Sequence, residues 1–194
     1  MGYKKKLLAT VFGAFAAAGS MQVQAADPSA AMMANTCAGC HGTDGASVGP
    51  ASPNLAGMSA IYFTDSMLAF KSGDRKSTIM GRIAKGYTDE QIEAMGEHFA
   101  ALPVYKAPQQ IDAALASKGA KVYDKGCAKC HDENGSLPDD DAGILAGQWL
   151  PYLEYSMEDF AAGDRDAPKK MAKAVSKLSD DELAAVLAFF ASQK

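Results

Sequence analysis

The five-residue pattern Cys-x-x-Cys-His occurs twice in this chain of 194 residues, with the two copies ninety residues apart. Two thiols separated by two residues on a helical turn reach the two vinyl groups of one haem, and the histidine that follows can ligate its iron. The pattern therefore predicts two covalently bound haem c groups. The residues that would hold them are Cys37, Cys40 and His41, and then Cys127, Cys130 and His131.

Three other uses of paired cysteines compete with this interpretation: a redox dithiol, a zinc ribbon and a disulfide framework in an exported protein. Each explains the cysteines but not a histidine placed twice at the same offset. A zinc ribbon also needs roughly 15 to 20 residues between its two cysteine pairs, whereas Cys40 and Cys127 lie much farther apart. The haem interpretation is therefore favoured.

The N-terminus has the pattern of a secretory signal peptide. Three lysines (residues 4–6) precede an apolar run over residues 7–18, and Val23-Gln24-Ala25 forms a small-residue cleavage site. We therefore predict a signal peptide over residues 1–25 and a periplasmic mature protein. A transmembrane helix needs about 20 consecutive apolar residues. No later segment approaches this length, so no membrane span is expected.

Charge limits the kinds of partner. The formal charge of −4 becomes −7 once the three leader lysines are removed. Phosphate recognition relies on clustered Lys and Arg, so an acidic mature chain is not expected to bind nucleic acid. A partner with a basic or apolar docking face fits better.

The two halves of the chain repeat each other beyond the cysteine motifs. Segments 55–57 and 70–75 match segments 145–147 and 160–165 at an offset of ninety, and segment 88–92 matches segment 179–183 at ninety-one. Such a long period indicates a duplicated domain. We predict an all-α fold with domains at 26–102 and 111–194, joined by a Pro-containing linker at 103–110.

Local signals place several helices. The pattern predicts helices near 60–72 and 150–162 that end at Gly73 and Gly163, and helices near 28–35 and 111–125. Capping boxes at Thr88 and Ser179 each open a last helix with apolar residues at helical spacing. Each half has only about 80 residues, a size at which side chains alone give a marginal core, so we expect the haem to complete it.

The sixth iron ligand separates a closed electron carrier from an open catalytic site. Among ten methionines, two pairs occupy equivalent places in both halves: Met67 with Met157, and Met80 with Met171. The first pair lies within amphipathic helices, where core packing explains it. The second pair is expected in irregular segments that can approach a haem face, so Met80 and Met171 are the predicted ligands.

These motifs resemble class I cytochrome c domains, and two in tandem resemble the dihaem cytochromes c. The stretches NTCAGCHGTDGASVGPASPNLAGM, FKSGDRKSTIMGRIAKGYT and ILAGQWLPYLEY are similar to the cytochrome subunit of flavocytochrome c sulfide dehydrogenase. The resemblance implies that His41 and Met80 ligate one iron and His131 and Met171 the other. It also implies an FAD-containing flavoprotein subunit that oxidises sulfide and passes electrons to the haems.

One departure from the family pattern concerns the carbonyl that holds the haem-binding histidine. The resemblance implies that the proline of Gly49-Pro50 supplies it in the first half, but Asp139-Asp140 stands opposite in the second. Bonds of this kind orient the ring and tune the metal. We therefore expect the two haems to differ in environment.

The predicted function is electron transfer without bond chemistry, from the flavoprotein to a soluble carrier. A free-standing dihaem shuttle of the c-four type, donating to a terminal oxidase, would use every residue named above. A dihaem peroxidase would need an open iron position, against which the two methionines argue. No Gly-x-Gly-x-x-Gly follows a strand, so a flavin would require a second chain.

Overall fold

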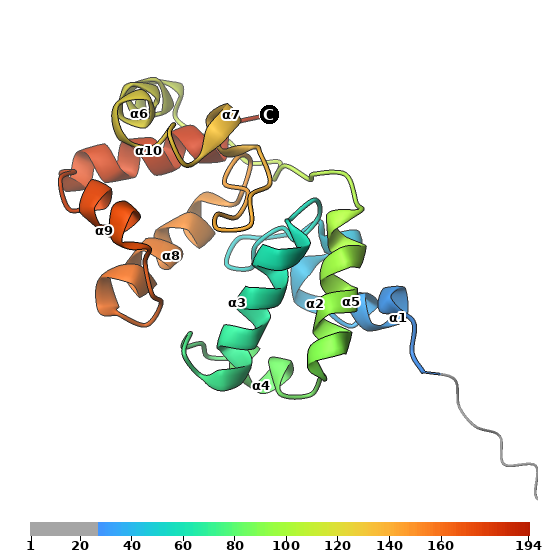
Figure 1. Ribbon diagram of the computed structural model, residues 1–194. Coiled ribbons are helices and arrows are strands. Elements are labelled where there is room, and N and C mark those ends of the chain that lie inside the picture. The colour runs from blue at the N-terminus through green and yellow to red at the C-terminus, as the bar shows by residue number, and fades with distance from the viewer. Residues whose placement is uncertain (1–26) are drawn as a thin grey trace, which may run out of the picture.

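The computed structural model describes residues 27–194, and the predicted signal peptide lies outside them. Within this range all regular structure is helical, which confirms the all-α prediction. The helices form two lobes joined by one extended connection (Figure 1). None of these helices is long and apolar enough to cross a membrane.

The first lobe contains five α-helices and one 3-10 turn. Their bounds are α1 (Ala30–Asn35), α2 (Ala38–His41), η1 (Thr43–Gly45), α3 (Ala60–Ser72), α4 (Met80–Ala84) and α5 (Asp89–Ala100). Helix α5 packs against α1 and α3, and the ring centroids of Phe63 and Phe99 lie 5.3 Å apart between α3 and α5. Ile92, Met95 and Phe99 are almost completely buried, so the apolar face of α5 is the centre of this core.

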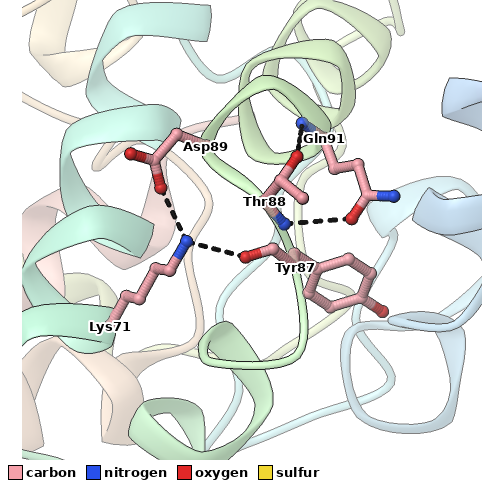
Figure 2. Close-up of polar contacts among 5 residues, drawn as sticks. All are labelled: Lys71, Tyr87, Thr88, Asp89 and Gln91. Carbon is pink, nitrogen blue, oxygen red and sulfur yellow. Dashed lines mark hydrogen bonds and ion pairs between the residues drawn. The ribbon is translucent and has the colours of Figure 1, made fainter.

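Polar contacts fix the junction between α3 and α5 (Figure 2). At the end of α3, the Lys71 ammonium donates to the Tyr87 carbonyl at 2.8 Å and pairs with Asp89 at 2.6 Å. Thr88 and Gln91 form the predicted capping box, in which each side chain bonds the other residue's backbone. These bonds satisfy N–H groups that have no partner within the helix, and so they determine where α5 begins.

The second lobe repeats this plan. Its helices are α6 (Ala113–Gly126), α7 (Asp132–Gly135), α8 (Leu150–Ala162), α9 (Lys169–Val175) and α10 (Asp180–Ser192). Helix α10 packs against α6 and α8. The α6–α10 crossing is close, because a Cβ added to Gly119 would lie 1.9 Å from the Ala185 carbonyl oxygen. The predicted helix ends at Gly73 and Gly163 are confirmed, and both glycines are left-handed.

A polar network joins the two lobes. The extended segment 103–110 connects α5 to α6, and its Ala107 N–H donates to the Gly147 carbonyl at 2.7 Å. The Trp149 indole N–H donates to the Ser47 carbonyl at 3.1 Å. Asn54 and Gln148 bond each other twice, and each side chain is 2% exposed. The two lobes therefore meet through directional bonds that fix their relative position.

Each lobe places an arginine near the interface by stacking it on a phenylalanine of the same lobe. The Arg75 guanidinium lies over the Phe70 ring, and that of Arg165 lies over Phe160, each at 4.4 Å. Arg165 also donates to the Tyr62 hydroxyl of the other lobe at 2.5 Å. Burial raises the pKa of the equivalent Tyr152, but the charges of Arg165 and Arg75, together with the hydrogen bonds that its hydroxyl makes with Ser156 and Arg75, lower it overall.

Candidate haem sites

The first Cys-x-x-Cys-His motif forms a single helical turn. Cys37 caps α2, and the His41 N–H closes the turn by donating to the Cys37 carbonyl at 2.9 Å. Cys37 is half-buried, Cys40 is exposed and His41 is 8% exposed. The turn therefore brings two thiols and one imidazole together, as attachment of a single haem requires.

A backbone carbonyl fixes the orientation of the His41 ring. The His41 Nδ1 lies 2.9 Å from the Pro53 carbonyl oxygen. Because a carbonyl only accepts hydrogen bonds, Nδ1 carries the proton and Nε2 keeps its lone pair. A histidine in this state can ligate a metal through Nε2, and the carbonyl makes that nitrogen more basic.

The carbonyl bound to His41 differs from the one that the family resemblance implied. The structure places Pro53 at this position, not Pro50. The sequence offered two prolines within four residues, and no local pattern separates them. In the second half, Gly143 is the equivalent of Pro53.

The second motif has the same turn with different support. The His131 N–H donates to the Cys127 carbonyl at 3.0 Å, and His131 then caps α7 in a non-helical conformation. The Tyr123 hydroxyl donates to the His131 carbonyl at 2.8 Å. The His131 ring packs edge-on against Phe190, with centroids 5.9 Å apart. The neighbour of the His131 imidazole is therefore the hydrophobic ring of Phe190, whereas that of His41 is a backbone carbonyl.

Burial shifts the protonation of these groups towards their neutral forms. It lowers the pKa of His41, while the Pro53 bond partly opposes the shift. It likewise lowers the pKa of His131, with the Asp139 charge acting in the opposite direction. Neutral imidazole is the form that binds a metal. The two histidines are therefore ready to act as ligands near neutral pH.

The cysteines do not have the features of the competing site types. Burial raises the pKa of Cys37 and of Cys127, whereas a redox dithiol needs a thiol of lowered pKa. All four cysteines are unpaired, contrary to a disulfide framework. Within residues 27–194, no three His, Cys, Asp or Glu side chains gather in a way that could hold a metal ion, as a zinc ribbon would require.

The methionines proposed as sixth ligands lie on short helices, so the expectation of irregular segments was wrong. Met80 is the first residue of α4 and Met171 the third residue of α9, and both are half-buried. Met67 is 5% exposed within the first core, and Met157 packs against the second core. Core packing therefore accounts for Met67 and Met157, as expected.

The residues present fit a haem in each lobe. Each lobe has two unpaired thiols on one turn, a neutral imidazole, and a half-buried thioether on a separate element. Bound there, a haem supplies a one-electron couple. The cysteines of each motif would hold the macrocycle, and the Pro53 carbonyl would orient the His41 imidazole through its Nδ1 side.

Comparison with known families agrees with the repeated architecture. The Cytochrome c family model matches the chain twice, over residues 26–114 and 116–194. The chain is also similar to a solved structure of cytochrome c4 from Pseudomonas stutzeri. The TM-score is 0.72 at 27% identity, over 82% of this chain and 94% of that one.

Two further relatives are named for dehydrogenases of sulfur compounds. A "thiosulfate dehydrogenase electron acceptor" from Stutzerimonas stutzeri is 33% identical over 89% of each chain. A "cytochrome subunit of sulfide dehydrogenase" from Chlorobaculum tepidum is 50% identical, over 33% of this chain and 57% of its own.

Proposed function

The chain belongs to the cytochrome c family, and from this membership we propose that it accepts electrons from a dehydrogenase of inorganic sulfur compounds. It is a dihaem c-type electron-transfer protein with two tandem class I domains. The proposal concerns its electron donor, its ligand residues and its location.

We assign the haem-binding residues as follows. His41 and Met80 ligate the iron of the first domain, and His131 and Met171 that of the second. The thioethers come from Cys37, Cys40, Cys127 and Cys130. The bond from His41 Nδ1 to Pro53 supports the histidine role, since it leaves Nε2 free for iron. We place the domains at 26–102 and 111–194, with the linker at 103–110.

The donor that we propose is an FAD-containing flavoprotein subunit that oxidises sulfide. The observation that carries this proposal is the 50% identity of one third of the chain to a sulfide dehydrogenase cytochrome subunit. This chain lacks the glycine-rich fingerprint of a dinucleotide-binding fold, so the flavin would belong to a partner chain. Electrons would then leave through a soluble carrier in the periplasm.

A second candidate donor is a thiosulfate dehydrogenase. Similarity to a thiosulfate dehydrogenase electron acceptor extends over 89% of the chain, much farther than the similarity to the sulfide dehydrogenase subunit. The similarity to cytochrome c4 also supports a third alternative, a free-standing shuttle that donates electrons to a terminal oxidase. All three roles use the same haem-binding residues and differ only in the partner.

The test is an absorption spectrum of the protein isolated natively from its own cells, followed after addition of sulfide or thiosulfate. Flavin bands together with sulfide-driven haem reduction would support the flavoprotein partner. Reduction by thiosulfate through a co-purifying chain without flavin would support the second candidate. Flavin-free protein that both compounds leave oxidised would overturn both and favour the independent shuttle.

A further inference from the structure

We propose that Gln148, a residue of the second domain, positions and tunes the haem-binding histidine of the first domain. It would act through one peptide group, the link between Pro53 and Asn54. The inference rests on the proposed role of His41 as an iron ligand. Gln148 touches neither His41 nor a haem cysteine, so it is a positioning residue.

The contacts form a continuous chain across the domain interface. His41 Nδ1 donates to the Pro53 carbonyl at 2.9 Å. The N–H of the same peptide group belongs to Asn54, and it donates to Gln148 Oε1 at 2.9 Å. Gln148 Nε2 returns a bond to the Asn54 carbonyl at 3.0 Å. One side chain of the second domain therefore holds both backbone polar groups of Asn54.

Further bonds keep this peptide in place. Asn54 Oδ1 accepts from the Ser47 N–H at 3.0 Å, and Asn54 Nδ2 donates to the Tyr105 carbonyl at 3.3 Å. Asn54 and Gln148 are each 2% exposed, and His41 is 8% exposed. Water therefore does not compete for these bonds, which makes each of them electrostatically stronger than in solvent.

Hydrogen bonds in series through one amide polarise each other. The bond from Asn54 N–H to Gln148 makes the Pro53 carbonyl oxygen a better acceptor, and His41 Nδ1–H is then held more strongly. A stronger bond at Nδ1 raises the basicity of the ligating nitrogen. A more basic ligand stabilises the oxidised iron, so loss of the Gln148 bond should raise the potential of the first haem.

The second domain has no equivalent of the bonds that link Gln148, Asn54 and Pro53 to His41. Met58 occupies the position equivalent to Gln148, and its thioether carries no N–H donor. Gly143 and Ile144 replace Pro53 and Asn54. Contact between the domains therefore acts on the first haem through a route that the second haem lacks.

The test compares the potentials of both haems in the wild-type dihaem protein and in Gln148→Met, which installs the side chain of the equivalent position. NMR of the haem methyl resonances follows each haem separately. We expect a rise in the potential of the first haem and no shift in the second. Equal shifts in both haems, or no shift in the first, would overturn the inference.

Two further variants separate tuning of the first haem from a general loss of hydrogen bonds around Gln148. Gln148→Glu keeps an oxygen that can accept from the Asn54 N–H, so the redox potential of the first haem should stay at or below the wild-type value. Gln109→Met removes bonds that hold the linker on the second domain, those to the Gln148 carbonyl at 2.6 Å and from the Leu150 N–H at 2.9 Å, without touching the Pro53–Asn54 peptide. It should leave the first haem's potential unchanged.

These variants also decide the case in which Gln148→Met fails to accumulate. A raised potential of the first haem in Gln148→Glu, or in Gln109→Met, contradicts a specific route through Asn54. Failure of the proposed function has a different signature, because the wild-type protein would then lack histidine-ligated haem at the first motif.

Discussion

The two histidines that we propose as haem ligands have unequal neighbours at the level of single residues. His41 donates to a backbone carbonyl in a buried site, while the ring of His131 packs against Phe190 and senses the charge of Asp139. A hydrogen bond to the distal nitrogen of a metal-binding histidine makes the ligand more basic. We therefore expect single residues to make the redox potentials of the two haems differ, although both halves share one motif.

From this asymmetry we expect a redox titration of the wild-type protein to show two steps, with the first domain's haem at the lower potential. One net hydrogen bond is worth about 1 kcal/mol, which corresponds to a separation on the order of 40 mV for one electron. Spectroelectrochemistry measures the separation. A single step fitted by two equal potentials would contradict the prediction.

The ligand assignment makes a second prediction, on methionine. Met80→Ala should remove the sixth ligand of the first iron, so the low-spin spectrum of that haem is lost and its potential falls. Met67→Leu is the matched control, because Met67 is 5% exposed in the core. That change should keep the spectrum and cost under about 1.5 kcal/mol of stability. Absorption spectra of both oxidised variants decide, and a spectral change in the control alone would reject Met80.

Among the helices, the equivalent pair α4 and α9 differs in how it is supported. Helix α4 buries Ala84 completely and packs against α3. Helix α9 has no buried residue among its seven. A helix this short is unstable unless it packs against other groups. The element that carries Met171 therefore depends on the haem more than its counterpart does.

We expect haem removal to expose this difference in amide hydrogen exchange. In a Cys127→Ala/Cys130→Ala variant, α9 should exchange at close to the rate of an unfolded segment. In the matched Cys37→Ala/Cys40→Ala variant, α4 should keep measurable protection through Ala84. Mass spectrometry of the peptides that cover each helix provides the measurement. Equal protection of α4 and α9 would show that packing is not the deciding factor.

The crossing of α6 and α10 gives a prediction about one glycine. A Cβ at Gly119 would lie 1.9 Å from the Ala185 carbonyl, so Gly119→Ala must push the helices apart. We expect a loss of about 3 kcal/mol, at the upper end of overpacking costs. Gly126→Ala in the same helix meets no atom within 4 Å and should be neutral or stabilising by up to about 1 kcal/mol. Denaturant unfolding of both variants tests the contrast.

For the whole molecule, the interface makes the two domains one mechanical unit. The Asn54–Gln148 pair, the Trp149 bond to Ser47 and the Arg165 bond to Tyr62 all cross it. Lys76 and Asp164 add an exposed ion pair at 2.5 Å, whose contribution is small because solvent screens the two charges. Buried directional bonds, not the ion pair, fix how the two haem sites face each other.

We therefore expect the dihaem protein to unfold in one transition, with coincident curves from circular dichroism and haem absorbance. Trp149→Ala removes the bond to Ser47 and the ring that packs on Gly49. It should cost about 3 to 5 kcal/mol and separate the unfolding of the two domains. Lys76→Ala, on the same interface, should leave a single transition. Two transitions in the wild-type protein would contradict the coupling.

The sequence by itself determined the features that depend on near neighbours along the chain. Glycines and apolar spacing located α3 and α8 at their observed bounds, and hydroxyl and amide or carboxylate side chains three residues apart located the starts of α5 and α10. Turn, cap and periodicity are local physics. The repeated motif likewise implied two haems without any tertiary information.

Only the tertiary structure decided which groups meet across long chain separations. It selected Pro53 over Pro50 as the partner of His41, and it brought Gln148 of the second domain to the peptide beside that proline. It also showed that Met80 and Met171 lie on short helices. These outcomes depend on how loops return and how two domains dock. The sequence alone allows several hydrogen-bond partners for each of these polar groups, and the packing of the folded chain selects among them.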